Sequence, residues 1–201
     1  MAEITEFRWH GRAGQGLITA VELLAQAALE EGLYFQAFPE FGAERTGAPM
    51  RAYSRFSRQP ITLHCPVAEP HGVIILDSSL LKSENVFAGL LPGGFALVNT
   101  SRTPETLRQQ TKLSGYRLYT VPASRIAREV IGRDMPNIPA IGALLQVIGL
   151  VNKDTMIRLV RARMSTRLAP KVVEANIQAL EQASRELAGE KTAPTPALER
   201  R

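Results

Sequence analysis

Residues 8–20 read RWHGRAGQGLITA, and this stretch decides how the N-terminal part of the chain folds. An extended run over residues 4–10 leads into three glycines, and an apolar helical pattern begins at Leu17. Glycine permits positive φ angles and close approach of the backbone, and the N-terminus of a helix carries a partial positive charge. The order strand, glycine turn, helix therefore predicts either a tight structural turn or a contact with an anion.

The spacing of the glycines does not match two common nucleotide-binding motifs. Gly11, Gly14 and Gly16 are spaced G-x-x-G-x-G, which is the reverse of the dinucleotide-binding fingerprint. No Gly-Lys-Ser/Thr follows, as a P-loop would require. Neither motif is satisfied, and the choice between a structural turn and a ligand contact stays open on these residues alone.

The length and composition fit one globular domain. The chain has 201 residues, of which 45% are apolar, enough to bury a core. We expect a single domain over residues 1–188 and a flexible tail over residues 189–201. No run approaches the roughly 18 apolar residues of a membrane span, and the early Glu3 and Glu6 do not fit a signal peptide. We therefore expect a cytoplasmic protein that does not interact with membranes.

Cysteine usage limits the chemistry that this chain can carry. Cys65 is the only cysteine, which excludes an internal disulfide and a cysteine-ligated iron–sulfur cluster or zinc site held by this chain alone. His64 and Cys65 are neighbours in a predicted strand over residues 61–65, so their side chains point to opposite faces and form no nucleophile–base pair. We expect Cys65 to be a small buried residue and expect no metal site.

The net charge of +5 rests mostly on arginine. Arginine suits pairing with carboxylates and phosphates across an interface. The arginines are scattered, apart from a local group at Arg158, Arg161, Arg163 and Arg167, and no nucleic-acid-binding signature accompanies them. The sequence therefore does not predict a nucleic-acid partner.

Periodicity predicts alternating strands and helices. A continuous apolar run over residues 72–77 indicates a strand buried on both faces, and strict alternation over residues 50–56 indicates a half-exposed strand. The other predicted strands are residues 33–38, 61–65, 95–100 and 117–121, and the predicted helices are residues 17–32, 101–112, 123–131, 139–151, 153–164 and 170–187. These elements predict an α/β fold with an open, mostly parallel sheet, an antiparallel portion and a helical C-terminal region.

Several connecting residues have candidate roles. The charged loop over residues 39–49 follows a strand, where open sheets place ligand or partner contacts, although a solvated surface loop is the alternative. Asp77 ends the buried strand, and we interpret it as a helix cap rather than a catalytic carboxylate. Asp154 is the predicted cap of the next-to-last helix. Gly142 and Gly149 suggest close helix packing.

Two stretches taken together resemble a known family. Residues 8–16 and residues 37–52, with the sequence AFPEFGAERTGAPMRA, resemble the gamma subunit of 2-oxoacid:ferredoxin oxidoreductases, the pyruvate synthase family. The resemblance extends through residues 73–81, which include Asp77, and through residues 138–143. It covers residues 4 to 185 and omits the predicted tail.

The resemblance implies a Rossmann-like α/β domain, with helices on both faces of the sheet, that has no cofactor chemistry of its own. In this family the gamma chain assembles with alpha, beta and delta chains. Thiamine diphosphate and Mg²⁺ lie between alpha and beta, and [4Fe-4S] clusters lie in beta and delta. The complex decarboxylates a 2-oxoacid oxidatively and transfers the acyl group to coenzyme A. Electrons pass to ferredoxin or, through a flavin subunit, to NAD. This chain would be a required but non-catalytic subunit.

The resemblance also implies where a site would lie. We assign two facing loops at the carboxyl edge of the sheet to the coenzyme A region or to a subunit interface. Their residues are Gly11, Arg12, Gly14, Gln15 and Gly16 in the first loop and Glu44, Arg45, Thr46 and Gly47 in the second. Arg12 and Arg45 would pair with phosphate or a partner, or would only hold the loops together.

Two other functional classes stay open. The main alternative is a free-standing module that binds a nucleotide or acyl-CoA outside any such complex. An independent hydrolase has less support, because the sequence contains no nucleophile elbow around a serine and no cluster of metal ligands.

Overall fold

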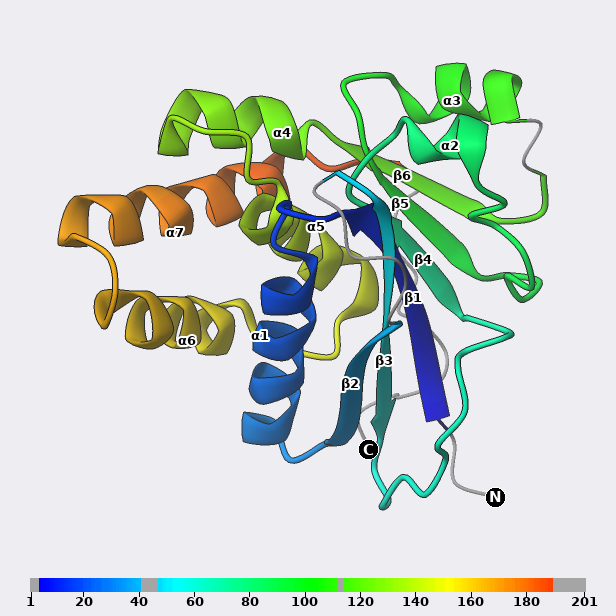
Figure 1. Cartoon of the computed structure of the whole chain (residues 1–201), viewed down its shortest axis with the longest axis horizontal. Coiled ribbons are helices and arrows are strands. Elements are labelled where there is room, and N and C mark those ends of the chain that lie inside the picture. Colours follow the sequence, from blue (N-terminus) through cyan, green and yellow to red (C-terminus); the bar gives the residue numbers. More distant parts are fainter. Residues whose placement is uncertain (1–3, 41–46, 112–113, 190–201) are drawn as a thin grey trace.

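The computed structural model describes residues 4–40, 47–111 and 114–189 (Figure 1). The strands are β1 (Ile4–Arg12), β2 (Tyr34–Glu40), β3 (Pro49–Ser57), β4 (Gly72–Ile75), β5 (Phe95–Asn99), β6 (Arg117–Val121) and β7 (Ala188–Gly189). The helices are α1 (Leu17–Glu30), α2 (Leu80–Ser83), α3 (Pro104–Thr111), α4 (Ala123–Ile126), the π-helix η1 (Ala127–Ile131), α5 (Asn137–Ile148), α6 (Lys153–Ser165) and α7 (Pro170–Arg185).

All seven strands form one mixed sheet in the order β2-β3-β1-β4-β5-β6-β7. Strands β1, β4, β5 and β6 pair in parallel, while β3 pairs antiparallel with both β1 and β2. Because β3 is antiparallel to both β1 and β2, these two strands run in the same direction. Only β3 and the short β7 run opposite to the other strands. The predicted α/β class, with a mostly parallel sheet and an antiparallel portion, is confirmed.

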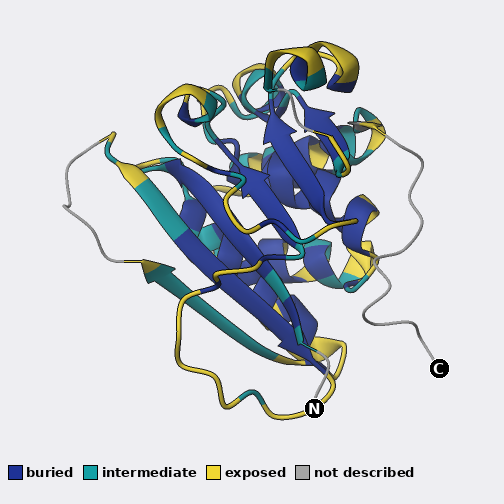
Figure 2. Ribbon diagram, turned by 90° about the vertical axis from the view of Figure 1, so that its right-hand side faces the viewer, coloured by how far each residue is buried: buried dark blue, intermediate teal, exposed yellow. Residues whose placement is uncertain are grey.

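Helices cover both faces of the sheet. Helices α1, α5, α6 and α7 lie on one side, which we call the α1 face, and α2 and α3 lie on the other, the α2 face (Figure 1). In β4 and β5 alternate residues enter the two cores: Ile74 and Leu97 face α1, whereas Val73 and Val98 face α2. The central strands are therefore buried on both sides, while the edge strand β2 is only partly buried (Figure 2).

From β1, the order of the strands proceeds toward one edge of the sheet and then, from β4 onward, toward the other edge. The unit β1–α1–β2 runs toward one edge along the α1 face, whereas β4–α2–β5 and β5–α3–β6 run toward the other edge along the α2 face. Neighbouring strands β1 and β4 therefore form a topological switch point. In open α/β sheets, ligands bind in the crevice outside the carboxyl ends of such strands.

Strand β3 differs from its prediction, because it is buried from Ala52 to Ser57 instead of half-exposed. The polar side of the strand carries Arg55, which is fully buried on the α2 face. Its Nε lies 2.6 Å from Glu6 Oε1, and its Nη1 donates to Gln36 Oε1 at 3.1 Å. The alternating pattern predicted that this polar face of the strand is solvated, but Tyr53 and Arg55 on that face are buried.

The predicted strand over residues 61–65 is wrong. This segment contains no regular structure, and its backbone carbonyls accept hydrogen bonds from side chains of the sheet. Gln36 Nε2 donates to Leu63 O at 2.9 Å, and Arg55 Nη2 donates to Cys65 O at 2.6 Å. Cys65 is exposed, contrary to its expected burial. Side chains thus replace the backbone ladder that the period-two pattern predicted.

The helical C-terminal region follows the prediction in outline. Gly142 does permit close packing, because a Cβ there would lie 2.1 Å from Leu180 O of α7. Gly149 instead ends α5 with a positive φ and no atom within 4 Å of a built Cβ. The cap of α6 is Asn152, whose side chain accepts from the Asp154 backbone N–H at 2.8 Å, so the predicted cap at Asp154 is wrong by two residues.

The ends of the described chain add two facts. Gly189, the first residue of the predicted tail, belongs to β7 and pairs with Tyr119 of β6. Residues 190–201 lie outside the described residues. Within the described ranges, no helix combines the length and apolarity that crossing a membrane requires.

The contact between α5 and α7 leads to a stability prediction. In Gly142→Ala the added methyl group clashes with the Leu180 carbonyl, and this overpacking should outweigh the better helix propensity of alanine, for a net loss of about 1–2 kcal/mol. Urea denaturation measures this change. Gln146→Ala, at an exposed position of the same helix, is the control and should stay within about 0.5 kcal/mol. Equal stability of Gly142→Ala and the wild type would contradict the packing.

The buried Arg55 leads to a second prediction. Arg55→Ala removes the partner of Glu6 and the donor to Cys65 O, so the free energy of unfolding should fall by about 3 kcal/mol. Protease cleavage within residues 58–66 should also accelerate, because that segment loses its anchor. Arg161→Ala, which breaks an exposed pair with Glu174, should cost much less stability, because solvent screens exposed ion pairs. If both variants lose the same stability, Arg55 has no special role.

Candidate functional site

The glycine turn joins β1 to α1 at the carboxyl edge of the sheet. Gly11 and Arg12 belong to β1, which is two residues longer than predicted, and the turn itself spans residues 13–16. Gly14 and Gly16 have φ angles of +96° and +75°, so both positions favour glycine. A Cβ on Gly16 would also lie 2.4 Å from Nδ2 of Asn137, the first residue of α5. The turn is therefore constrained by its backbone conformation and by packing against α5.

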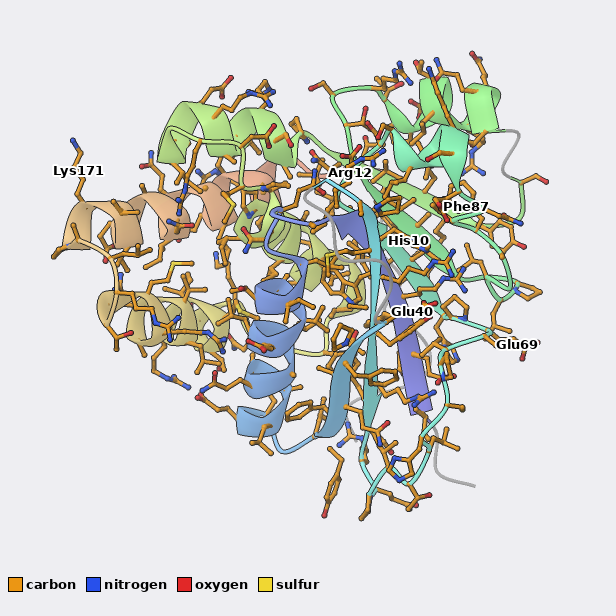
Figure 3. The ribbon with its side chains drawn as sticks, viewed as in Figure 1. His10, Arg12, Glu40, Glu69, Phe87 and Lys171 are labelled. Atoms are coloured by element: carbon orange, nitrogen blue, oxygen red, sulfur yellow. The ribbon has the colours of Figure 1, made fainter. Side chains whose placement is uncertain are left out.

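Arg12 connects this turn to two other loops. Its Nε lies 3.1 Å from Asp77 Oδ2, its Nη1 donates to Gly47 O at 2.9 Å, and its Nη2 donates to Ser79 Oγ at 2.9 Å. The label in Figure 3 marks Arg12 at the edge where these loops meet. One guanidinium thus joins the ends of β1 and β4 to the segment before β3.

Of the second loop assigned from the sequence, only Gly47 lies within the described residues, and Gly47 and the following Ala48 contact the first loop. Besides the Arg12–Gly47 contact, Ala13 N donates to Ala48 O at 3.1 Å. The remaining assigned residues of this loop, Glu44, Arg45 and Thr46, lie outside the described residues. The predicted pairing of Arg45 therefore stays a prediction. For Arg12, the contacts correspond to the alternative in which this residue holds the loops together.

Gln15 fixes the same corner. Its Oε1 accepts from Arg12 N at 2.8 Å, and its Nε2 donates to Asp77 Oδ2 at 3.1 Å. Asp77 Oδ1 accepts from Ser79 N at 2.9 Å, and Asp77 O accepts from Leu80 N, so this residue organises the turn into α2. The N-cap of α2 is Ser79, which makes no side-chain cap hydrogen bond, so the predicted cap at Asp77 is wrong by two residues. Burial alone would raise the pKa of Asp77, but the hydrogen bonds from Ser79 and Gln15 and the charge of Arg12 lower it. Asp77 is therefore an ionised structural acceptor at neutral pH.

A polar cleft of about 300 Å³ opens beside this corner, outside the carboxyl ends of β4, β5 and β6. Its lining residues are Gln15, Leu76, Asp77, Ser78, Asn99, Thr100, Ser101, Pro122, Ser124, Arg125, Arg128 and Asp134. Hydroxyl and amide groups dominate, and two guanidinium groups come from α4 and η1. Such a surface can bind a polar or anionic part of a ligand.

Asn99 holds the wall of this polar cleft together. Its Nδ2 donates to Leu76 O at 2.8 Å and to Ser124 Oγ at 2.9 Å, while its Oδ1 accepts from Ser124 N at 2.9 Å. Asn99 therefore links the ends of β4, β5 and β6 and is not free for a ligand. The site residues predicted from the sequence did not include Asn99, Ser124, Arg125 or Arg128. The available signal was that these residues end or follow predicted strands.

The two arginines of the polar cleft are already paired. Arg125 forms ion pairs with Glu129 and Glu186, and Arg128 lies 2.7 Å from Asp134. Pairing neutralises much of their charge, so the cleft is polar without being a strong anion trap. A ligand that bears phosphate would have to share these guanidinium groups with their carboxylates.

A second polar cluster lies on the α2 face around His10. A cleft of about 200 Å³ is lined by His10, Glu40, Met50, Arg51 and Glu84, among others. His10 is 2% exposed, and its Nε2 accepts from Arg8 Nε at 3.1 Å. Burial and the charges of Arg8 and Arg51 lower the pKa of His10 to about 3. The imidazole is therefore neutral at physiological pH and is a weak base.

Metal chemistry has no support in the part of the chain that the structure describes. No group of three or more His, Cys, Asp or Glu side chains there could hold a metal ion. Cys65 is exposed near the end of an irregular segment, where its Sγ lies 3.6 Å from Arg55 Nη2.

The sequence of this chain matches known proteins over most of its length. The family model described as pyruvate ferredoxin/flavodoxin oxidoreductase matches residues 6–186. The chain is 43% identical over 175 residues to pyruvate synthase subunit PorC of Thermotoga maritima, with 87% of this chain and 90% of that protein covered. It is 40% identical over 176 residues to the gamma subunit common to the pyruvate and ketoisovalerate oxidoreductases of Thermococcus litoralis, with 88% and 95% covered.

Solved structures give the same result. The crystal structure of pyruvate oxidoreductase subunit PORC from Thermotoga maritima matches with a TM-score of 0.81 and 39% identity, and covers 94% of this chain and 99% of that one. A 2-oxoglutarate:ferredoxin oxidoreductase from Magnetococcus marinus, described with 2-oxoglutarate, coenzyme A and succinyl-CoA bound, matches with a TM-score of 0.74. At 18% identity, and with 33% of that chain covered, this likeness shows the fold alone. The chain therefore belongs to the pyruvate ferredoxin/flavodoxin oxidoreductase family, in which it is a gamma-type subunit of a multi-subunit enzyme.

Proposed function

We propose that this gamma subunit has no oxidoreductase chemistry of its own and instead shapes the coenzyme A region of the complex with its carboxyl-edge loops. The observation that supports the proposal is the junction at Arg12, whose side chain contacts Asp77, Ser79 and Gly47 beside a polar cleft at the switch point. We also propose that alpha, beta and delta subunits complete the enzyme and hold thiamine diphosphate, Mg²⁺ and the [4Fe-4S] clusters. A flavin subunit that passes electrons to NAD is an optional addition.

The name of one relative supports the proposed non-catalytic role. A gamma subunit common to pyruvate and ketoisovalerate oxidoreductases serves two enzymes that act on different 2-oxoacids. In those enzymes, the residues that discriminate between the substrates must lie on other subunits. We infer that this chain likewise leaves the choice of 2-oxoacid to its partners.

The size of the polar cleft supports a shared ligand site. About 300 Å³ is at the lower limit of small-molecule pockets, which run from roughly 300 to 1,000 Å³. The residues fit only a polar segment of coenzyme A, because hydroxyl, amide and paired guanidinium groups line the cleft and almost no apolar surface does. We therefore propose that a neighbouring subunit completes the site.

The first test separates a subunit from an independent enzyme. The isolated chain, supplied with thiamine diphosphate, Mg²⁺, a 2-oxoacid and coenzyme A, should reduce no ferredoxin or viologen dye. The complex with all subunits co-expressed should reduce the dye under identical conditions. Turnover by the isolated chain would overturn the proposed non-catalytic role, and binding of coenzyme A by the isolated chain with full affinity would favour a free-standing module.

The second test addresses the junction. In the complex, Arg12→Gln removes the ion pair to Asp77, so the segments that this guanidinium joins lose their shared charged contact. If the loops then no longer hold their arrangement beside the cleft, the KM for coenzyme A should rise by about tenfold, which corresponds to roughly 1.4 kcal/mol of lost binding energy. The KM for the 2-oxoacid should change little, because that substrate binds on other chains in this proposal. Arg161→Gln, which breaks a surface pair with Glu174, is the matched control. Unchanged coenzyme A kinetics in Arg12→Gln would remove the carboxyl-edge loops from the site.

A further inference from the structure

A separate groove of about 720 Å³ lies on the α1 face, away from the carboxyl-edge site. Its walls are α1, α6 and the turns that follow η1 and α6. On α1 the lining residues Thr19, Leu23 and Gln26 follow helical spacing and so lie on one side of that helix. The apolar floor consists of Leu23, Leu159, Met164 and Leu168.

The local group of arginines at Arg158, Arg161, Arg163 and Arg167 lies on and just after α6, beside this groove. Three members of that group are neutralised within the described chain: Arg158 pairs with Glu30, Arg161 with Glu174, and Arg163 with Glu22. These pairs join α6 to α1 and α7. Most of these arginines therefore form ion pairs between helices of the same chain and do not make up a basic patch for nucleic acid.

Two arginines at the groove are exceptions. Arg133 follows η1 and Arg167 follows α6, and both are exposed and line the groove. Neither side chain forms an ion pair or hydrogen bond with any described residue. No aspartate or glutamate lines the groove either. The groove therefore presents an apolar floor between two unpaired positive charges.

This composition matches that of a protein interface. Interface cores are rich in aromatic residues, Met and Arg and poor in Lys, Glu and Asp. The groove lining has no aromatic residue, but it contains Met164 and three arginines and no Lys, Glu or Asp. A phosphate ion or a nucleic-acid backbone would satisfy Arg133 and Arg167 but leave Met164 and Leu168, which the chain itself only partly covers, in water. An occupant that covers both needs an apolar side and carboxylates beside it, which an amphipathic helix provides.

We propose that this groove binds an acidic amphipathic helix of another subunit of the oxidoreductase. Apolar side chains of that helix pack on Leu159, Met164 and Leu168, and its carboxylates pair with Arg133 and Arg167. This interface lies on a different part of the molecule from the proposed coenzyme A region, so either proposal can fail without the other.

The test reverses the two free charges in the assembled enzyme. With all subunits co-expressed, native mass spectrometry measures how much of this chain stays in the complex on dilution. Loss of two interface anchors worth about 2 kcal/mol or more should weaken binding by about 30-fold or more in Arg133→Glu/Arg167→Glu. Arg133→Lys/Arg167→Lys keeps the charge and should retain most of the binding. Assembly of the charge-reversed variant at the wild-type level would overturn the proposal.

The matched control reverses two other exposed, unpaired cations. Lys82 lies on α2, and Lys171 points away from the body at the start of α7 (Figure 3); neither lines the groove. Lys82→Glu/Lys171→Glu should change binding by no more than about twofold, as surface substitutions usually do. An equal loss in this control would mean that net charge, not the groove, governs assembly, and would also overturn the proposal.

A labelling experiment locates the contact independently of charge. Ala162 lines the groove and is exposed, so Ala162→Cys, in a Cys65→Ser background, should react readily with a maleimide in the isolated chain and be protected in the complex. Equal labelling in both states would show that the groove stays open. Protection in the isolated chain, with a dimer seen by sedimentation, would identify a second copy as the occupant and contradict the proposal.

Discussion

The carboxyl edge of this domain depends on a single guanidinium. Arg12 ends β1 and contacts Asp77 and Ser79 beyond β4 and the carbonyl of Gly47 before β3. These three segments lie far apart in sequence and have few apolar side chains with which to pack. A charged donor with several N–H groups in one plane can hold them in a defined arrangement, which a lysine could not reproduce. The shape of the crevice at the switch point follows from this junction.

The two halves of the sheet are stabilised by different means. In β4, β5 and β6, apolar residues alternate into two cores that helices cover. Around β3, the α2 face instead buries Arg55 and His10, with Arg8 beside them, and an irregular segment closes part of that layer through hydrogen bonds from Arg55 and Gln36. A buried polar layer of this kind requires defined partners for each group, so it favours one arrangement of the antiparallel strands.

The surface of the domain is divided in the same way. The carboxyl edge presents hydroxyl, amide and paired guanidinium groups suited to a polar ligand, whereas the groove on the α1 face presents leucine, methionine and unpaired arginine. The pairs Arg158–Glu30 and Arg163–Glu22 connect α6 to α1, the two helices that line that groove. In the proposed function, the first surface lies toward the ligand and the second toward a neighbouring subunit.

The sequence by itself determined the α/β class and the glycine turn, because periodicity and local backbone preferences act over a few residues. It also identified Gly142 as a packing position. Tertiary structure decided that β3 lies between β1 and β2, that residues 61–65 form no strand, that Arg55 is buried and that Asn99 closes the polar cleft. Each of these depends on partners distant in the sequence. Alternation in a strand shows which residues share a face, but only the folded chain decides whether water or protein covers that face.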